Sequence, residues 1–133
     1  MEEEPDYIAY EGDMYRIEFY YDDKGKSQSQ AYMLEKFSGV DAKKFQHLLK
    51  MMGDMGKIRN KEKFRNEGDK VYAFKPQPHR FLCFFFDGKK IIITNAFMKK
   101  QQKLPETEKA KALKCKKDYE NRIKKGSYYE EEK

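Results

Sequence analysis

The chain has 133 residues, a net charge of +6, and 39% charged against 38% hydrophobic residues. This length suits one domain with a thin apolar core. No apolar run approaches the roughly 20 residues that span a bilayer, and the acidic opening is unlike a signal peptide, so a cytoplasmic protein with no membrane contact is expected. Cys83 and Cys115 lack metal-ligand spacing. We expect two reduced core cysteines and no metal or cofactor.

The charge is unevenly distributed along the chain. Residues 1–13 hold six acids and no base, so the rest of the chain carries +12. The segment KIRNKEKFR (57–65) has five bases to one acid, and residues 89–125 have thirteen bases to four acids. The lysines of the C-terminal helix, taken alone, are explained as a well-solvated helix surface. The two basic segments together favour a polyanionic partner, which is a nucleic acid or the ribosome.

The first elements are a strand and a helix. MYRIEFYYD (14–22) is rich in aromatic and branched residues, which predicts a strand with both faces partly covered. Ser27 or Ser29 can then cap a helix that runs to about Phe37. Gly39 is predicted to end this helix in the left-handed conformation.

A second helix follows directly. Asp41 is predicted to cap it, and Gly53 or Gly56 to end it. His47 lies among its core positions, so a structural role is expected for that histidine. Apolar residues recur at helical spacing along one face: Phe45, Leu48, Leu49, Met52 and Met55.

Three strands are predicted after the basic segment 57–65. KVYAFK (70–75) is the first, and the turn PQPH (76–79) ends it because prolines resist a central ladder. RFLCFFF (80–86) is the most apolar and is expected at the centre of the sheet. Asp87-Gly88 is a strong two-residue hairpin sequence that leads into KIIITNAF (90–97).

A last helix is predicted from Pro105, with Gly126 as its end. Its narrow apolar stripe consists of Ala112, Cys115, Tyr119 and Ile123. The expected fold is an α+β domain of order β-α-α-β-β-β-α, with helices on one side of a mainly antiparallel sheet. We expect a flexible acidic segment (1–13), one folded domain (14–125) and a frayed acidic tail (126–133).

The strand 90–97 runs directly into bunched lysines: NAFMKKQQKLP (95–105). With FFFDGKKIIIT before it, this stretch resembles the most specific pattern of the RelE/ParE toxin superfamily, in particular its phage-derived HigB-like branch. The order of elements over residues 14–122 is also similar to that family. Further similar pieces are Gly25-Lys26-Ser27, Met52 to Gly56, Lys63-Phe64, VYAFK (71–75) and Arg80. The family usually has arginine at the position of Lys75 and commonly threonine at that of Gln101.

The resemblance implies the toxin of a type II toxin–antitoxin pair. Such toxins are endoribonucleases (mRNA interferases) that cut mRNA on the translating ribosome and are neutralised by a small antitoxin, here expected to be a helix-turn-helix protein. Two other functions stay open. One is a ParE-like gyrase poison, which shares the fold without RNA chemistry, and the other is a non-catalytic phage-derived module that binds nucleic acid or a host protein.

Metal-free RNA cleavage builds negative charge on a phosphorane, which fixed cations stabilise. Candidate catalytic cations come from adjacent strand ends: Lys75, Arg80, Lys99 and Lys100. Since adjacent strand residues point to opposite faces, we expect at most one of the last two to face the phosphate. His79 is a candidate acid or base, and Lys75 with a pKa lowered by cationic neighbours is the alternative. Candidate RNA-binding residues are Lys57, Arg59, Lys61, Lys63, Arg65 and Lys103.

Overall fold

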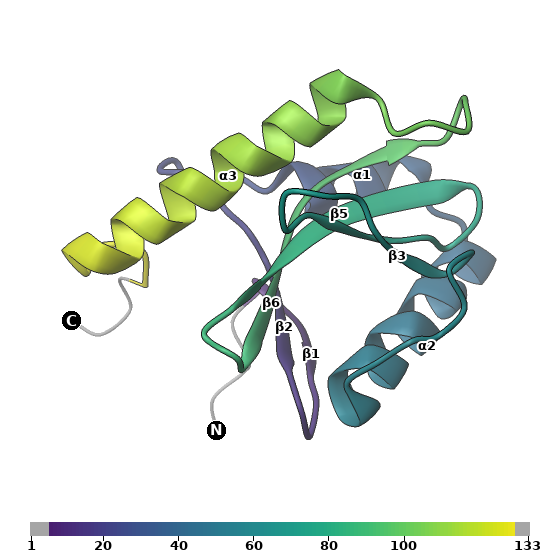
Figure 1. Ribbon diagram of the computed structural model, residues 1–133, viewed down its shortest axis with the longest axis horizontal. Coiled ribbons are helices and arrows are strands. Elements are labelled where there is room, and N and C mark those ends of the chain that lie inside the picture. The colour runs from purple at the N-terminus through teal and green to yellow at the C-terminus, as the bar shows by residue number, and fades with distance from the viewer. Residues whose placement is uncertain (1–5, 130–133) are drawn as a thin grey trace.

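One six-stranded sheet and three helices make up residues 6–129, the part of the chain that the computed structural model describes (Figure 1). In chain order the elements are β1 (Ile8–Glu11), β2 (Arg16–Phe19), α1 (Gln28–Lys36), α2 (Gly39–Met55), β3 (Phe64–Asn66), β4 (Tyr72–Phe74), β5 (His79–Phe86), β6 (Lys90–Met98) and α3 (Glu106–Lys125). The strands lie side by side in the order β1-β2-β6-β5-β4-β3. The mixed α+β class is confirmed, and the short strands β1 and β3 are additions to the predicted order.

The hairpin of β5 and β6 forms the centre of the sheet. Asp87 and Gly88 have φ angles of 59° and 69°, the left-handed conformation that a two-residue hairpin turn needs. The predicted hairpin and the central place of residues 80–86 are therefore confirmed. Within the described sheet, β2 and β6 pair in parallel and the other neighbours are antiparallel.

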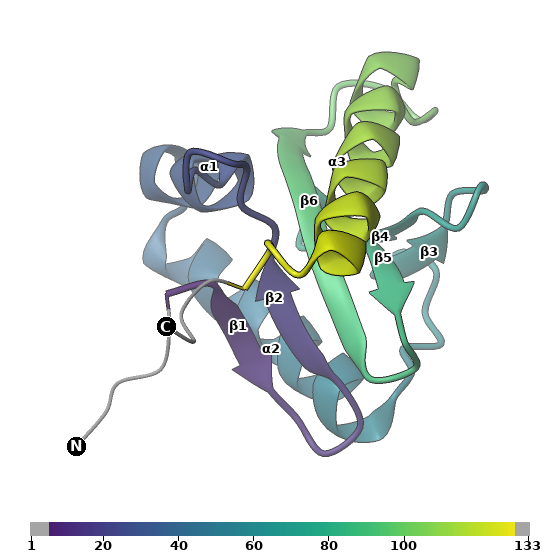
Figure 2. The same cartoon turned by 90° about the vertical axis from the view of Figure 1, so that its left-hand side faces the viewer.

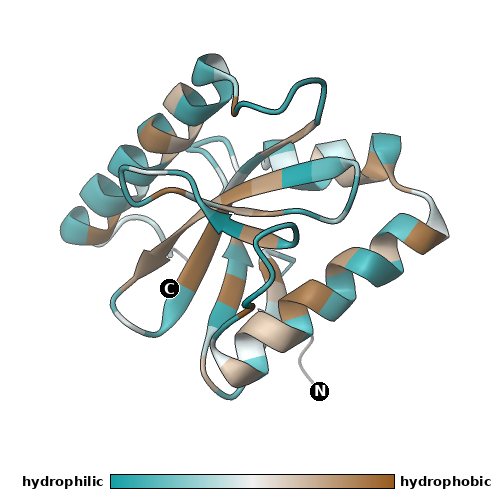
Figure 3. Cartoon of the chain, turned by 45° about the vertical axis from the view of Figure 1, so that its right-hand side comes forward, coloured by the Kyte–Doolittle hydropathy of each residue, from teal (hydrophilic) through white to brown (hydrophobic). Residues whose placement is uncertain are grey.

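Helices cover both faces of the sheet, so the prediction of helices on one side is wrong. α1 and α2 share a core with Phe81 and Cys83, whereas α3 packs over Leu82 and Phe84. Figures 1 and 2 show α2 and α3 on opposite sides of the strands. Successive strand residues point to opposite faces, so a strand that is apolar at every position needs cover on both. Figure 3 shows this apolar character along the central strands.

The helix boundaries follow their capping residues. Ser27 caps α1, as predicted. Ser38 caps α2 in a capping box, in which Asp41 N donates to Ser38 Oγ at 3.1 Å and Ser38 N donates to Asp41 Oδ2 at 3.0 Å. Gly39 therefore starts α2 and does not end α1, because this pair of caps begins the next helix at once. Gly56, with φ 81°, ends α2.

The N-terminal segment is partly structured, contrary to the predicted flexibility of residues 1–13. Ile8–Glu11 forms β1, which pairs antiparallel with β2. Tyr10 joins it to α2, because its hydroxyl donates to Asp54 Oδ2 at 2.8 Å. The apolar and aromatic residues between the acids explain this extra edge strand. Residues 1–5 lie outside the described part of the chain.

The C-terminal segment folds back onto the sheet. Tyr128 is 1% exposed, and its hydroxyl accepts from Tyr21 N at 3.0 Å. Tyr129 donates to Glu18 Oε1 at 2.6 Å. The predicted fraying is therefore wrong for these two tyrosines, whose rings fill space beside α3. Residues 130–133 lie outside the described residues.

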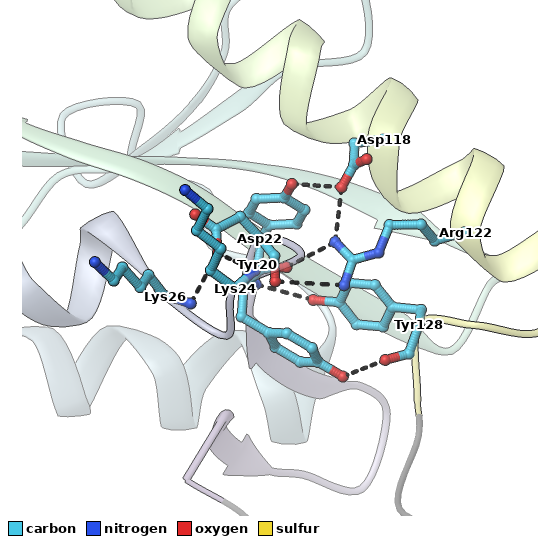
Figure 4. A network of polar contacts seen from close by, with 8 residues as sticks. Tyr20, Asp22, Lys24, Lys26, Asp118, Arg122 and Tyr128 are labelled. Atoms are coloured by element: carbon cyan, nitrogen blue, oxygen red, sulfur yellow. Dashed lines mark hydrogen bonds and ion pairs between the residues drawn. The ribbon is translucent and has the colours of Figure 1, made fainter.

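A polar network joins the second half of α3 to the loop before α1 (Figure 4). Arg122 Nη1 donates to Asp118 Oδ2 at 2.7 Å and to Tyr21 O at 3.0 Å. Tyr20 also donates to Asp118 Oδ2, at 2.5 Å, and the Arg122 guanidinium lies 4.6 Å from the Tyr128 ring centroid. This network fixes α3 across the sheet and so positions the first turns of the helix, which border the candidate site.

Candidate functional site

Three cationic side chains meet where β4 and β6 end and β5 begins. The register pairs Phe74 with Phe81 and Arg80 with Phe97, so Lys75 follows β4 directly beside Arg80. Lys99 lies two residues beyond Phe97, and its backbone N–H donates to Pro78 O at 2.9 Å. Strand alternation places these three cations on the sheet face that α3 covers.

Together they line a cavity of about 500 Å³ between this sheet face, the 99–104 loop and the first turns of α3. A volume of this size accommodates a nucleotide-sized ligand. Within residues 6–129, the cationic side chains of the lining are Arg65, Lys75, Arg80, Lys99, Lys103 and Lys109, and the acidic ones are Glu67 and Glu106. The cavity is therefore strongly cationic, and it suits an anionic ligand.

Arg80 is largely buried, with 8% of its surface exposed. Its Nη1 donates to Gln77 Oε1 at 3.2 Å and to His79 O at 3.0 Å. These acceptors are neutral and hold the guanidinium in place without cancelling its charge. Burial lowers the pKa of Arg80, and Glu67 opposes the shift, but a guanidinium stays protonated in proteins. Arg80 is thus a fixed positive charge on the cavity wall.

Lys75 has a different electrostatic environment. Its Nζ donates to Lys61 O at 3.1 Å, so the backbone of the basic loop holds the ammonium group. Burial is the main cause that lowers the pKa of Lys75, followed by the charge of Arg80. Glu67 acts in the opposite direction. A lowered pKa is what the hypothesis of a lysine base requires of Lys75.

His79 lies outside the cavity, although it is adjacent to Arg80 in sequence. Its ring is buried on the opposite face of the sheet, where Nδ1 lies 2.7 Å from the Tyr32 hydroxyl and Nε2 lies 3.2 Å from Asp41 Oδ2. Phe37 packs on the imidazole with a centroid distance of 4.7 Å. Both nitrogens are occupied, so His79 has a structural position and cannot reach a phosphate bound at Arg80.

The remaining predicted residues divide between cavity and surface. Lys99 lines the cavity and Lys100 does not, and both lie beyond Met98, where β6 ends. Arg65 and Lys103 also line it, while Lys63 borders a second hollow beyond Lys75. The other predicted RNA-binding residues are exposed on the loop before β3, outside both linings: Lys57, Arg59 and Lys61.

The cavity residues that the sequence reasoning missed include Lys109 and Glu67. Lys109 comes from α3, and its Nζ donates to Glu67 O at 3.1 Å and pairs with Asp69 Oδ2 at 2.8 Å. Lys109 precedes Ala112 by three residues, so the two side chains lie on the same side of the helix. The apolar stripe of the helix could therefore have predicted that Lys109 faces the sheet. Glu67 carries no such pattern, because only tertiary folding brings it near Arg80.

The fold and cavity define a small α+β protein with a preformed cationic cavity. The sequence profile of the family described as Phage derived protein Gp49-like (DUF891) matches residues 32–117, and the chain belongs to this family. The family is part of the RelE/HigB-like toxin superfamily and is associated with toxin endoribonucleases. The matched segment includes every residue that lines the cavity.

No curated protein sequence matches the chain significantly. In the described residues, no helix combines the length and the apolar character that a membrane span requires. Residues 6–129 also contain no group of three or more histidine, cysteine, aspartate or glutamate side chains placed to hold a metal ion.

Proposed function

We propose that the protein is the toxin of a type II toxin–antitoxin pair and cleaves mRNA on the translating ribosome. One observation carries this proposal: Lys75, Arg80 and Lys99 line a single cavity although they come from three different strand ends. Membership of a family associated with toxin endoribonucleases supports it.

The reaction is attack by a ribose 2′-hydroxyl on the adjacent phosphorus. Lys75 in its neutral form takes the 2′ proton, a new P–O2′ bond forms and the P–O5′ bond breaks. The 5′ oxygen leaves with a proton from Lys99, so the products are a 2′,3′-cyclic phosphate and a 5′-hydroxyl. Arg80 stabilises the phosphorane between these steps, because its planar fork matches two phosphate oxygens.

Arg80 is the residue to test first. Removal of a preorganised charge typically costs about 100- to 1000-fold in rate, so Arg80→Ala should abolish growth arrest and mRNA cutting. Arg80→Lys should restore activity only in part, since the charge returns without the fork. The measurement is primer extension on mRNA after induction of the wild type and both variants.

Two controls separate chemistry from folding. Arg80 is buried, so thermal unfolding must show that both Arg80 variants fold. Lys99 is only half-buried, and Lys99→Ala is a second test of whether the cavity carries the mRNA cleavage. Lys89→Ala removes an exposed charge at the far end of the hairpin and should cut like the wild type. Equal cutting by wild type and folded Arg80→Ala would contradict the assignment, and stalled DNA replication without mRNA cuts would favour the gyrase poison.

A further inference from the structure

A second hollow of about 380 Å³ adjoins the cavity. Lys75 belongs to the linings of both, so the two hollows are neighbours across this one side chain. The second lining consists of Lys43, Lys44, His47, Leu48, Lys63, Lys75, Pro76 and Gln77. Four of these described side chains are lysines and none is a carboxylate, in contrast to the cavity, which contains Glu67 and Glu106.

The outer face of α2 supplies one wall of this hollow. Lys43, Lys44 and His47 are all exposed there, while Leu48 turns into the core at 3% exposure. The expectation that His47 is structural is therefore wrong, because the apolar stripe of α2 passes beside it. No carboxylate of the described residues forms an ion pair with Lys43 or Lys44.

The opposite wall is held by backbone contacts. Gln77 Nε2 donates to Glu62 O at 3.0 Å, and Lys75 Nζ donates to Lys61 O. Lys75 N also donates to Lys63 O at 2.8 Å. The loop before β3 is thus fixed against the end of β4, and the position of Lys63 relative to Lys75 is set by the fold.

We propose that this hollow binds phosphates of the same single-stranded RNA whose scissile phosphate lies at Arg80, so that the strand passes over Lys75 from one hollow to the other. This inference rests on the proposed function. Proteins that bind single strands without sequence preference use a positive groove along the backbone, with about 4–16 nucleotides per site. The lining contains no aromatic ring among the described residues apart from the imidazole of His47, so the contacts are to phosphates and independent of sequence.

The test compares RNA binding by the wild type and the double variant Lys43→Ala/Lys44→Ala. Alanine has the highest helix propensity, so α2 should stay intact at these exposed positions. The probes are fluorescent 2′-O-methyl RNAs, which lack the attacking hydroxyl, of about four and about twelve nucleotides. Fluorescence anisotropy over a salt series gives the affinity and its salt dependence. The control variant, Lys114→Ala/Lys117→Ala, removes two exposed lysines from α3.

For the long probe, the double variant should bind more weakly, and the magnitude of its negative slope of log K against log salt should be smaller by about 1.4, or about 0.7 for each lost phosphate contact. Its affinity for the short probe, which the cavity alone can hold, should be unchanged. An unchanged slope for the long probe, or a loss equal to that of the control variant, overturns the inference while the proposed function stands. If the wild type binds neither probe, the proposed function fails as well.

Discussion

Arg80 and Lys75 are adjacent cations with different chemical capacities. The guanidinium of Arg80 is buried and held by two neutral acceptors, so its charge is permanent and well oriented. The ammonium group of Lys75 is desolvated and faces cationic neighbours, which favours loss of its proton. A lysine at this strand end therefore gives the site a group that titrates, which arginine would not.

The proposed role of Lys75 predicts a pH dependence. In the free protein, burial and Arg80 hold the pKa of Lys75 below its ordinary value of 10.5. The neutral form is the base, so kcat/KM for RNA cleavage should rise with pH and level off at the lowered pKa. Lys75→Arg should remove this rise. The measurement is the rate of cleavage of a defined RNA at subsaturating concentration across a pH series.

Substitution of Glu67 provides a second test of this pH dependence. Glu67 raises the pKa of Lys75, so Glu67→Gln should lower that pKa and move the rise in kcat/KM to lower pH. Glu62→Gln is the matched control, because Glu62 is exposed on the loop before β3 and lies outside the cavity lining. A profile that is identical in wild type, Lys75→Arg and Glu67→Gln would exclude Lys75 as the base.

At the scale of elements, the position of α3 depends on contacts at both of its ends. Lys109 ties the first turns to the loop between β3 and β4. Asp118, through Tyr20, and Arg122, through the carbonyl of Tyr21, tie the second half to the loop before α1. The tail beyond the helix adds a third attachment through Tyr129 and Glu18. The wall of the cavity therefore depends on residues far from the cavity.

The contact of Tyr129 with Glu18 can be tested by its effect on stability. Glu18 is 0% exposed, and its Oε2 lies 3.1 Å from Arg16 Nε. Tyr129→Phe removes the hydrogen bond to Glu18 and also those that the hydroxyl makes with Lys90 and Tyr119. Above the raised pKa of Glu18, loss of the bond to the charged carboxylate alone should lower the free energy of unfolding by about 1.5–3 kcal/mol. Urea denaturation of wild type and variant measures the difference.

The pH dependence of this loss identifies its cause. Burial raises the pKa of Glu18 above its ordinary value of 4.5, so wild-type stability falls as pH rises from 4.5 to that raised pKa. The Tyr129 hydroxyl favours the ionised form, so its contribution is fully present above the raised pKa of folded Glu18 and should shrink as pH falls through that pKa. Tyr21→Phe, which loses a hydrogen bond to the carbonyl of Tyr128, should show a loss independent of pH across this range.

Across the whole molecule, charge and fold divide the chain into an acidic start and a basic body. The cavity and the second hollow open beside each other at Lys75, and both lie within the segment that the family profile matches. The protein therefore has an exposed cationic surface, and under the proposed function this surface binds RNA when the protein is free. A partner that controls such a protein must cover or neutralise that surface.

We therefore predict an acidic or amphipathic helix-turn-helix antitoxin that covers Lys75, Arg80 and Lys99. Its gene is expected beside that of the toxin. Co-expression should restore growth, and the two proteins should elute together in size-exclusion chromatography. Since Lys89 lies at the other end of the hairpin, Lys89→Ala should not weaken the complex, whereas Lys99→Ala should. Co-expression without rescue and without a complex would favour the non-catalytic module.

The sequence by itself determined the three helices and the strands β2, β4, β5 and β6, because the causes of these elements are local. The Asp87-Gly88 turn, the cap at Ser27 and the helix end at Gly126 are short-range effects of backbone conformation and side-chain hydrogen bonds. The sequence also indicated Lys75, Arg80 and Lys99 as one group, because strand alternation and the order of strands restrict where their side chains point.

Tertiary structure decided what depends on contacts between distant segments. His79 adjoins Arg80 in sequence, yet alternation and the packing of Tyr32 and Asp41 bury it on the opposite face. The cover of both sheet faces, the pairing of β1 and the burial of Tyr128 likewise follow from segments that meet only in the fold. Burial and the fields of neighbouring charges are sums over the whole structure, so the lowered pKa of Lys75 could be assigned to its causes only once that structure was known.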